Sequence, residues 1–78
     1  MLFALVAASA VFVDSDGWSH RRINHDAYEI FGPAQASDAD RMAAADRLCP
    51  KTGWESDSTV RLTRGGDKLR WRIVCRGR

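Results

Sequence analysis

Basic residues recur near the end of the chain at positions where guanidinium or ammonium groups could bind an anion. Four of them fall on one face of a β-hairpin predicted over residues 59–75: Arg61, Lys68, Arg70 and Arg72. The positions between them are mostly apolar, which is the pattern of a strand with one face in water. Guanidinium forks match the oxygen spacing of phosphate and carboxylate groups. These four residues are therefore the candidate site for an anionic group or partner.

The turn of this hairpin is predicted at Gly65 and Gly66, because two glycines can both adopt positive φ in a two-residue turn. The resulting register pairs Val60 with Trp71, Arg61 with Arg70, Leu62 with Leu69, and Arg64 with Asp67. Trp71 then points to the core, away from the basic face. Proteins that bind single-stranded nucleic acid usually stack bases on exposed aromatic rings, so this register favours an acidic partner over nucleic acid.

Arg61 and Arg70 would face each other in this register, and facing like charges are destabilising unless water or an acidic group neutralises them. Glu29 and Asp57 are the predicted internal counter-charges. The alternative interpretation is a solvated polar face without a ligand, because an exposed sheet face must carry polar groups and charge resists aggregation.

Two cysteines, Cys49 and Cys75, lie far apart in the sequence and lack the spacing of a zinc site or a Cys-x-x-Cys redox motif. Cys49 falls on the apolar side of a predicted helix, and Cys75 falls on the apolar face of the hairpin. A helix packed across the hairpin would bring the two sulfur atoms together, so the sequence predicts a disulfide. The alternative is a pair of buried free thiols.

Two histidines, His20 and His25, lie near Asp14, Asp16 and Asp26, and could form a metal site or a general base. No serine or cysteine stands beside them in a recognisable nucleophile motif. We interpret both histidines as surface residues. The sequence predicts no catalytic residue, no metal ligand and no cofactor.

The 78 residues carry a formal net charge of +2, which is unevenly distributed. Residues 57–78 contain seven basic and two acidic residues, whereas residues 1–56 contain five basic and eight acidic ones.

A domain of this size buries only about 60% of the surface that its unfolded chain exposes, so a covalent cross-link would add substantially to its stability.

An uncharged stretch, LFALVAASAVFV, occupies residues 2–13. It is too short to span a bilayer, which requires about 20 residues. Its Ala8-Ser9-Ala10 sequence has the small-x-small pattern of a signal cleavage site, although no basic side chain precedes the apolar run. Residues 1–13 are therefore expected to form a signal-derived segment or, alternatively, a first strand. The predicted disulfide also favours export, because disulfides persist in oxidising compartments.

A single small α+β domain is predicted for residues 14–78. Ser37 is a good N-cap for a helix over 39–49, acidic residues occupy its first turn, and Pro50 ends it. Met42 and Cys49 fall on the apolar side of this helix. Residues 27–31, stopped by Gly32 and Pro33, form a strand, and residues 18–24 are either a strand or irregular. We expect a small antiparallel sheet of three or four strands, with one helix packed on a face and the C-terminal hairpin.

These features predict a protein that binds rather than catalyses. The favoured function is a small, exported, disulfide-stapled interaction domain whose partner is an unidentified macromolecule, a protein or the envelope surface. The alternative is a cytosolic protein that binds nucleic acid or an acidic partner through the basic face. A small hydrolase or metal protein built around the histidines is a third hypothesis. No transmembrane span is predicted, and a free sheet edge could pair with a second copy to form a homodimer.

Overall fold

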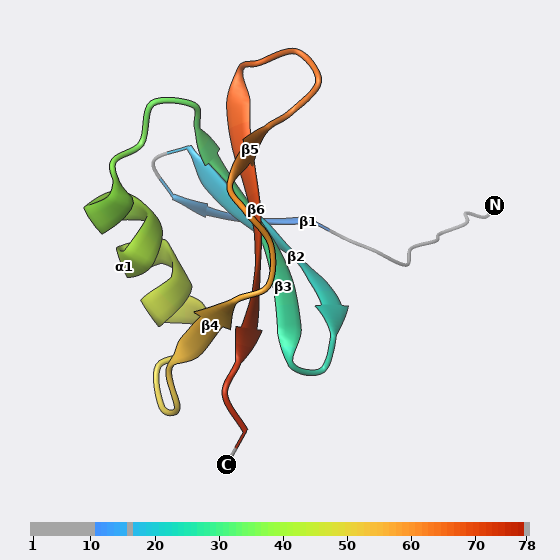
Figure 1. The fold of residues 1–78 in the computed structure, drawn as a ribbon, viewed down its shortest axis with the longest axis vertical. Coiled ribbons are helices and arrows are strands. Elements are labelled where there is room, and N and C mark those ends of the chain that lie inside the picture. The colour runs from blue at the N-terminus through green and yellow to red at the C-terminus, as the bar shows by residue number, and fades with distance from the viewer. Residues whose placement is uncertain (1–10, 16, 78) are drawn as a thin grey trace, which may run out of the picture.

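One helix and six strands form the part of the chain that the structure, a computed structural model, describes, residues 11–15 and 17–77 (Figure 1). In chain order they are β1 (Val11–Ser15), β2 (Trp18–Asn24), β3 (Ala27–Pro33), α1 (Asp38–Leu48), β4 (Trp54–Ser56), β5 (Arg61–Leu62) and β6 (Lys68–Cys75). Residues 1–10, which are most of the predicted apolar segment, lie outside the described residues, and the last residues of that segment, Val11 to Val13, belong to β1.

The strands form one antiparallel sheet in the order β1-β2-β3-β6-β4, and β5 also pairs with β6. Because β3 occupies one edge of β6, the short strands β4 and β5 share its other edge. Helix α1 packs on one face of the sheet (Figure 1). The predicted α+β class, with an antiparallel sheet and one helix, is confirmed. β5 is the first strand of the predicted hairpin, whereas β4 was not predicted, because its three residues are too few to show alternation in the sequence.

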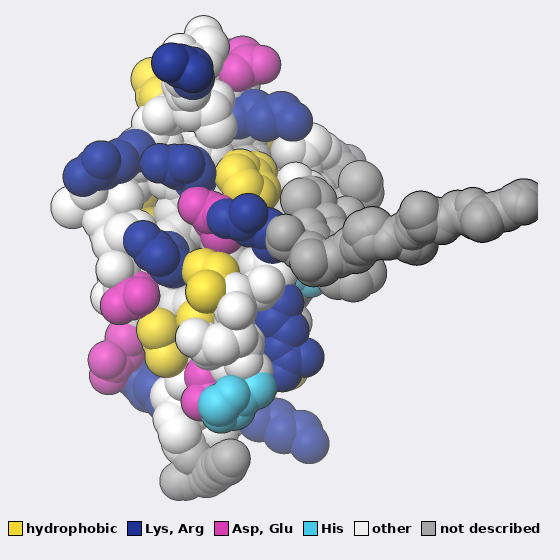
Figure 2. All heavy atoms as spheres, turned by 90° about the vertical axis from the view of Figure 1, so that its right-hand side faces the viewer, with side chains coloured by type: hydrophobic (Ala, Val, Ile, Leu, Met, Phe, Trp, Pro, Cys, Tyr) yellow, Lys and Arg dark blue, Asp and Glu magenta, His cyan; other side chains and the backbone are white. Residues whose placement is uncertain are grey.

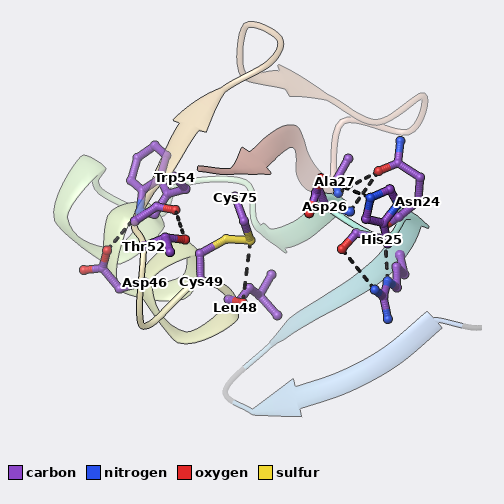
Figure 3. Close-up of a disulfide and its surroundings, with 12 residues drawn as sticks. Asn24, His25, Asp26, Ala27, Asp46, Leu48, Cys49, Thr52, Trp54 and Cys75 are labelled. Carbon is purple, nitrogen blue, oxygen red and sulfur yellow. Dashed lines mark hydrogen bonds and ion pairs between the residues drawn. A yellow bond between two sulfur atoms is a disulfide. The ribbon is translucent and has the colours of Figure 1, made fainter. Parts of the chain in front are cut away.

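The ambiguous segment 18–24 is the strand β2, which forms a hairpin with β3. The turn is closed by Asn24, whose Oδ1 atom accepts hydrogen bonds from the backbone N–H groups of Asp26 (2.9 Å) and Ala27 (3.1 Å), as in an Asx turn (Figure 3). β3 continues past the predicted stop to Pro33. Gly32 pairs with Leu69 within this strand, and it must be glycine because the ring of Trp18 occupies the space that a side chain there would need.

Helix α1 begins where the sequence predicts. Ser37 Oγ accepts a hydrogen bond from the backbone N–H of Asp40 (3.1 Å), and the helix is capped at Cys49, immediately before Pro50. Ala44 and Ala45 are its buried residues, so the helix approaches the sheet through methyl groups.

The predicted orientation of Met42 toward the sheet is wrong, because this side chain is 49% exposed. Arg41 takes its place, with its Cζ atom 4.8 Å from the centroid of the Trp71 ring. The aliphatic stem of an arginine can cover an apolar surface while its charge interacts with the π face, and an ion pair with Asp38 holds this guanidinium in place. Alanine methyl groups impose little preference on the rotation of the helix, so the contact with Trp71 decides it.

The core is centred on Trp71, Ile30 and Ile73, the largest fully buried side chains of the described residues. Trp54 packs edge-on against Trp71, with the ring centroids 5.1 Å apart. The indole N–H of Trp71 donates to Ser56 Oγ (2.8 Å), so the polar atom of this buried ring is satisfied.

A disulfide joins Cys49, at the end of α1, to Cys75, at the end of β6, as predicted (Figure 3). The two Cα atoms lie 5.4 Å apart, within the usual range for this bond. Close to it, Trp54 Nε1 donates to Asp46 Oδ1 (2.8 Å), which also connects β4 to the helix. The helix and the last strand are thus held together at one end of the sheet.

The predicted hairpin register is confirmed for Arg61 with Arg70 and Leu62 with Leu69. The turn itself differs, because only Gly66 has positive φ (76°) and the loop spans the four residues 64–67, closed by a hydrogen bond from Thr63 N–H to the carbonyl of Lys68 (2.8 Å). Arg64 and Asp67 therefore do not pair. Leu62 is 56% exposed, because the tip of the hairpin projects beyond the helix that would cover it (Figure 1).

Reduction of the disulfide is expected to lower the free energy of unfolding by about 3 kcal/mol, because the bond restricts the unfolded chain. Urea unfolding of the oxidised and reduced protein measures this difference. The variant Cys49→Ala/Cys75→Ala should resemble the reduced protein and should not respond to reductant. Equal unfolding midpoints for the oxidised and reduced forms would contradict a stabilising role.

Candidate anion-binding site

The predicted basic residues lie on the face of the sheet opposite α1. Alternate residues of β6 are buried and exposed, as the period of a strand requires. The exposed ones include Lys68, Arg70 and Arg72, and Arg61 lies beside Arg70 on β5. Figure 2 shows the side of the molecule away from the helix, where Lys and Arg side chains lie among acidic and apolar ones.

Among the charged residues that the structure describes, Glu29 is the buried one, and it is 8% exposed. On β3 it lies between Arg21 of β2 and Arg72 of β6 in the sheet register. Its carboxylate forms one ion pair with Arg21 and a second with Arg70, whose Nε atom lies 3.5 Å from Oε2. Glu29 is therefore a counter-charge of the basic face, as predicted, and two arginines share it.

The edge strand beside β6 is interrupted between β4 and β5. Ser56 pairs with Ile73 and Arg61 pairs with Arg70, so residues 57–60 lie opposite only residues 71–72. This bulge explains why the predicted pair of Val60 with Trp71 does not form.

Side chains replace part of the missing strand pairing at the bulge. The backbone N–H of Asp57 donates to the carbonyl of Arg72 (2.8 Å), and the N–H of Arg72 donates to Ser58 Oγ (3.1 Å). Ser58 Oγ in turn donates to the carbonyl of Thr59 (3.2 Å), and Ser56 Oγ donates to the carbonyl of Ser58 (3.1 Å). The bulged segment is therefore held in a defined conformation against β6.

A hollow of about 190 Å³ lies between the bulge and β6. Its lining residues are Glu29, Ser58, Thr59, Arg61, Arg70, Trp71 and Arg72. Three of the four predicted binding residues thus come together. Lys68 does not line the hollow, because it lies at the start of β6 next to the hairpin loop, opposite Pro33.

The three arginines of the hollow are neutralised unequally. Arg70 shares Glu29, and Arg72 has Asp57 with an Nε to Oδ2 distance of 4.0 Å. Among the described residues, Arg61 has no ion-pair partner. Since Arg61 also faces Arg70 directly across the strands, an anion between them would relieve their repulsion.

Ser58 lines the hollow and Arg21 shares the charge of Glu29, but neither residue was predicted from the sequence to belong to this site. The polar run 55–59 interrupts the alternation before Val60, and this interruption was the available signal for a bulge. Arg21 could be placed beside Glu29 only once the pairing of β2 with β3 was known.

The histidines are not brought into a comparable arrangement. His20, on β2, packs edge-on against Tyr28 with the ring centroids 5.7 Å apart, and His25 is exposed in the following turn with Asp26 3.3 Å away. The side chains of Asp14 and Asp16 lie outside the described residues. Within the described residues, no group of three or more His, Cys, Asp or Glu side chains could hold a metal ion.

No protein-family model, curated protein or solved structure matches this chain. In the part of the chain that the structure describes, no helix has the length and apolar character needed to cross a membrane.

Glu29→Gln is expected to lower the free energy of unfolding by about 1–2 kcal/mol, because it leaves Arg21 and Arg70 without their shared counter-charge. Urea unfolding should show a smaller loss at high salt, since ions screen the remaining repulsion.

The control for this substitution is Glu55→Gln, which removes an exposed ion pair with Arg76 and should cost less than about 0.5 kcal/mol. If both substitutions had the same effect, the buried position of Glu29 would be irrelevant to stability.

Proposed function

We propose that this chain is a small exported domain that acts by binding, without catalysis. Its binding surface is the basic face formed by Arg61, Lys68, Arg70 and Arg72, and its partner is an acidic protein or an anionic component of the cell envelope. The observation that carries the proposal is the hollow that three arginines and one glutamate line together. Guanidinium groups gathered in this way favour an anionic group over a neutral or cationic one.

Two features support export. The Cys49–Cys75 bond is of a kind that persists in oxidising compartments. The Ala8-Ser9-Ala10 sequence has the small-x-small pattern of a signal cleavage site, and cleavage after Ala10 would keep the strands that the structure describes.

An acidic partner is favoured over nucleic acid because Trp71 is 2% exposed and cannot stack on a base. Phe31 of β3 pairs with Arg70 of β6 and lies half-buried on the basic face. In the described sheet it is the one aromatic residue that pairs with an arginine of this face. Nucleic acid therefore belongs among the ligands that a binding experiment should compare.

The intact mass of the protein made in its native host should lack residues 1–10 and should be two hydrogens lower than that of the reduced chain. Reduction before the measurement should restore the two hydrogens without changing the N-terminus. A full-length chain with two free thiols would refute export.

The double variant Arg61→Gln/Arg72→Gln should bind polyglutamate, a mimic of an acidic protein surface, at least about tenfold more weakly than the wild type, because two charged contacts are lost. Binding by both proteins is measured at several salt concentrations, and the variant should show the weaker salt dependence.

The matched control is Lys51→Gln/Arg64→Gln, which removes the same charge from positions outside the hollow. Equal weakening in both variants would mean that net charge, and not the basic face, determines binding. An oligonucleotide bound more tightly than polyglutamate would identify nucleic acid as the better ligand.

A further inference from the structure

The hollow has hydrogen-bonding capacity that its own residues do not use. Across the described residues, no hydrogen bond involves the side chains of Arg61, Arg70 or Arg72. Arg70 and Arg72 approach their carboxylate partners through Nε, at 3.5 and 4.0 Å, and Arg61 approaches none. Because each guanidinium carries five N–H donors, many donors remain for a ligand.

The strand register arranges these three groups as a triangle. Arg61 and Arg70 are direct partners across the strands, which places their Cβ atoms about 5 Å apart. Arg72 follows Arg70 by two positions on the same face, about 7 Å further along β6. Three long side chains in this arrangement can converge on one small group from three directions.

The remaining lining residues are compatible with an anion. Glu29 also lines the hollow, but its charge is shared by Arg21 and Arg70, so this carboxylate does not neutralise all the arginines there. The hydroxyl of Ser58 is engaged within the bulge, whereas Thr59 adds a further hydroxyl to the lining.

We propose that the hollow binds one tetrahedral oxyanion with three free oxygen atoms, a phosphate monoester or a sulfate ester, in preference to a carboxylate. Each free oxygen can meet one guanidinium, whereas a carboxylate offers two oxygens in one plane and leaves the third arginine unpaired. This inference rests on the proposed function, because it names the chemical group that the basic face recognises. The group could be carried by a lipid headgroup or by a soluble ester.

The test is an NMR titration of the oxidised protein with inorganic phosphate, sulfate and acetate at constant ionic strength, following the arginine Nε–H signals. Phosphate should bind with a dissociation constant at least about tenfold below that of acetate, with shifts at all three arginines of the hollow. Arg61→Gln should weaken phosphate binding at least about tenfold, because a charged hydrogen-bond donor is lost.

Arg64→Gln is the matched control, since it removes the same charge from the loop of the same hairpin, and it should change phosphate affinity by less than about twofold. If Arg61→Gln loses the dispersed spectrum of the folded protein, phosphate affinity is measured in Arg72→Gln instead, and the same loss of affinity is expected. Equal affinity for phosphate and acetate, or equal losses in the Arg61 and Arg64 variants, would overturn the inference.

Vesicles separate the two sources of the group. Binding to phosphatidic acid in phosphatidylcholine, lost in Arg61→Gln and absent with phosphatidylcholine alone, supports a lipid headgroup. Binding of methyl phosphate without vesicle binding supports a soluble ester. If polyglutamate binding depends on the basic face but phosphate shows no preference, this inference fails and the proposed function stands. If neither ligand depends on that face, the proposed function fails as well.

Discussion

The burial of Trp71 in the middle of β6 is the interaction on which the rest of the structure depends. Arg41 of α1 lies over its ring, Trp54 of β4 packs against its edge, and Ser56 accepts its indole hydrogen bond. One side chain therefore joins the helix, the central strand and the edge strand. Because residues alternate along a strand, an inward Trp71 also obliges Arg70 and Arg72 to point outward.

So small a core needs additional constraints. Among the described residues, only a few large side chains are fully buried, and the helix contributes mainly alanine methyl groups to the contact. The Cys49–Cys75 bond ties the end of that helix to the end of β6, and it acts on the unfolded chain without requiring more apolar surface. The same shortage of apolar contacts explains why an arginine, with its long aliphatic stem, covers the central tryptophan.

The candidate site arises where the regular sheet is interrupted. Four residues of the edge segment face two residues of β6, and the hydroxyl groups of Ser56 and Ser58 satisfy backbone and indole groups there. The bulge turns Arg61 and Arg70 into the border of a hollow instead of a flat ridge. Glu29, buried beneath them, limits the repulsion enough for several arginines to share one face. Sheet irregularity and incomplete neutralisation are together the basis of the proposed anion site.

Local patterns in the sequence were sufficient for the helix with its Ser37 cap, for β3, for the register of Arg61 with Arg70, and for the side of β6 on which Cys75 lies. Each of these depends on neighbours within a few residues or on the two-residue period of a strand. The disulfide could be predicted because the helical pattern placed Cys49, and the strand alternation placed Cys75, on the sides that face the core.

Tertiary structure decided what local patterns could not. The rotation of α1, with Arg41 inward and Met42 outward, depends on the position of Trp71 in space. The bulge at 57–60 depends on hydrogen bonds to Arg72, and the pairing of Arg21 with Glu29 depends on the neighbouring strand. The sequence alone thus determined which side chains are basic and which face they share. Contacts between distant segments decided which of these arginines are neutralised and which converge on a hollow.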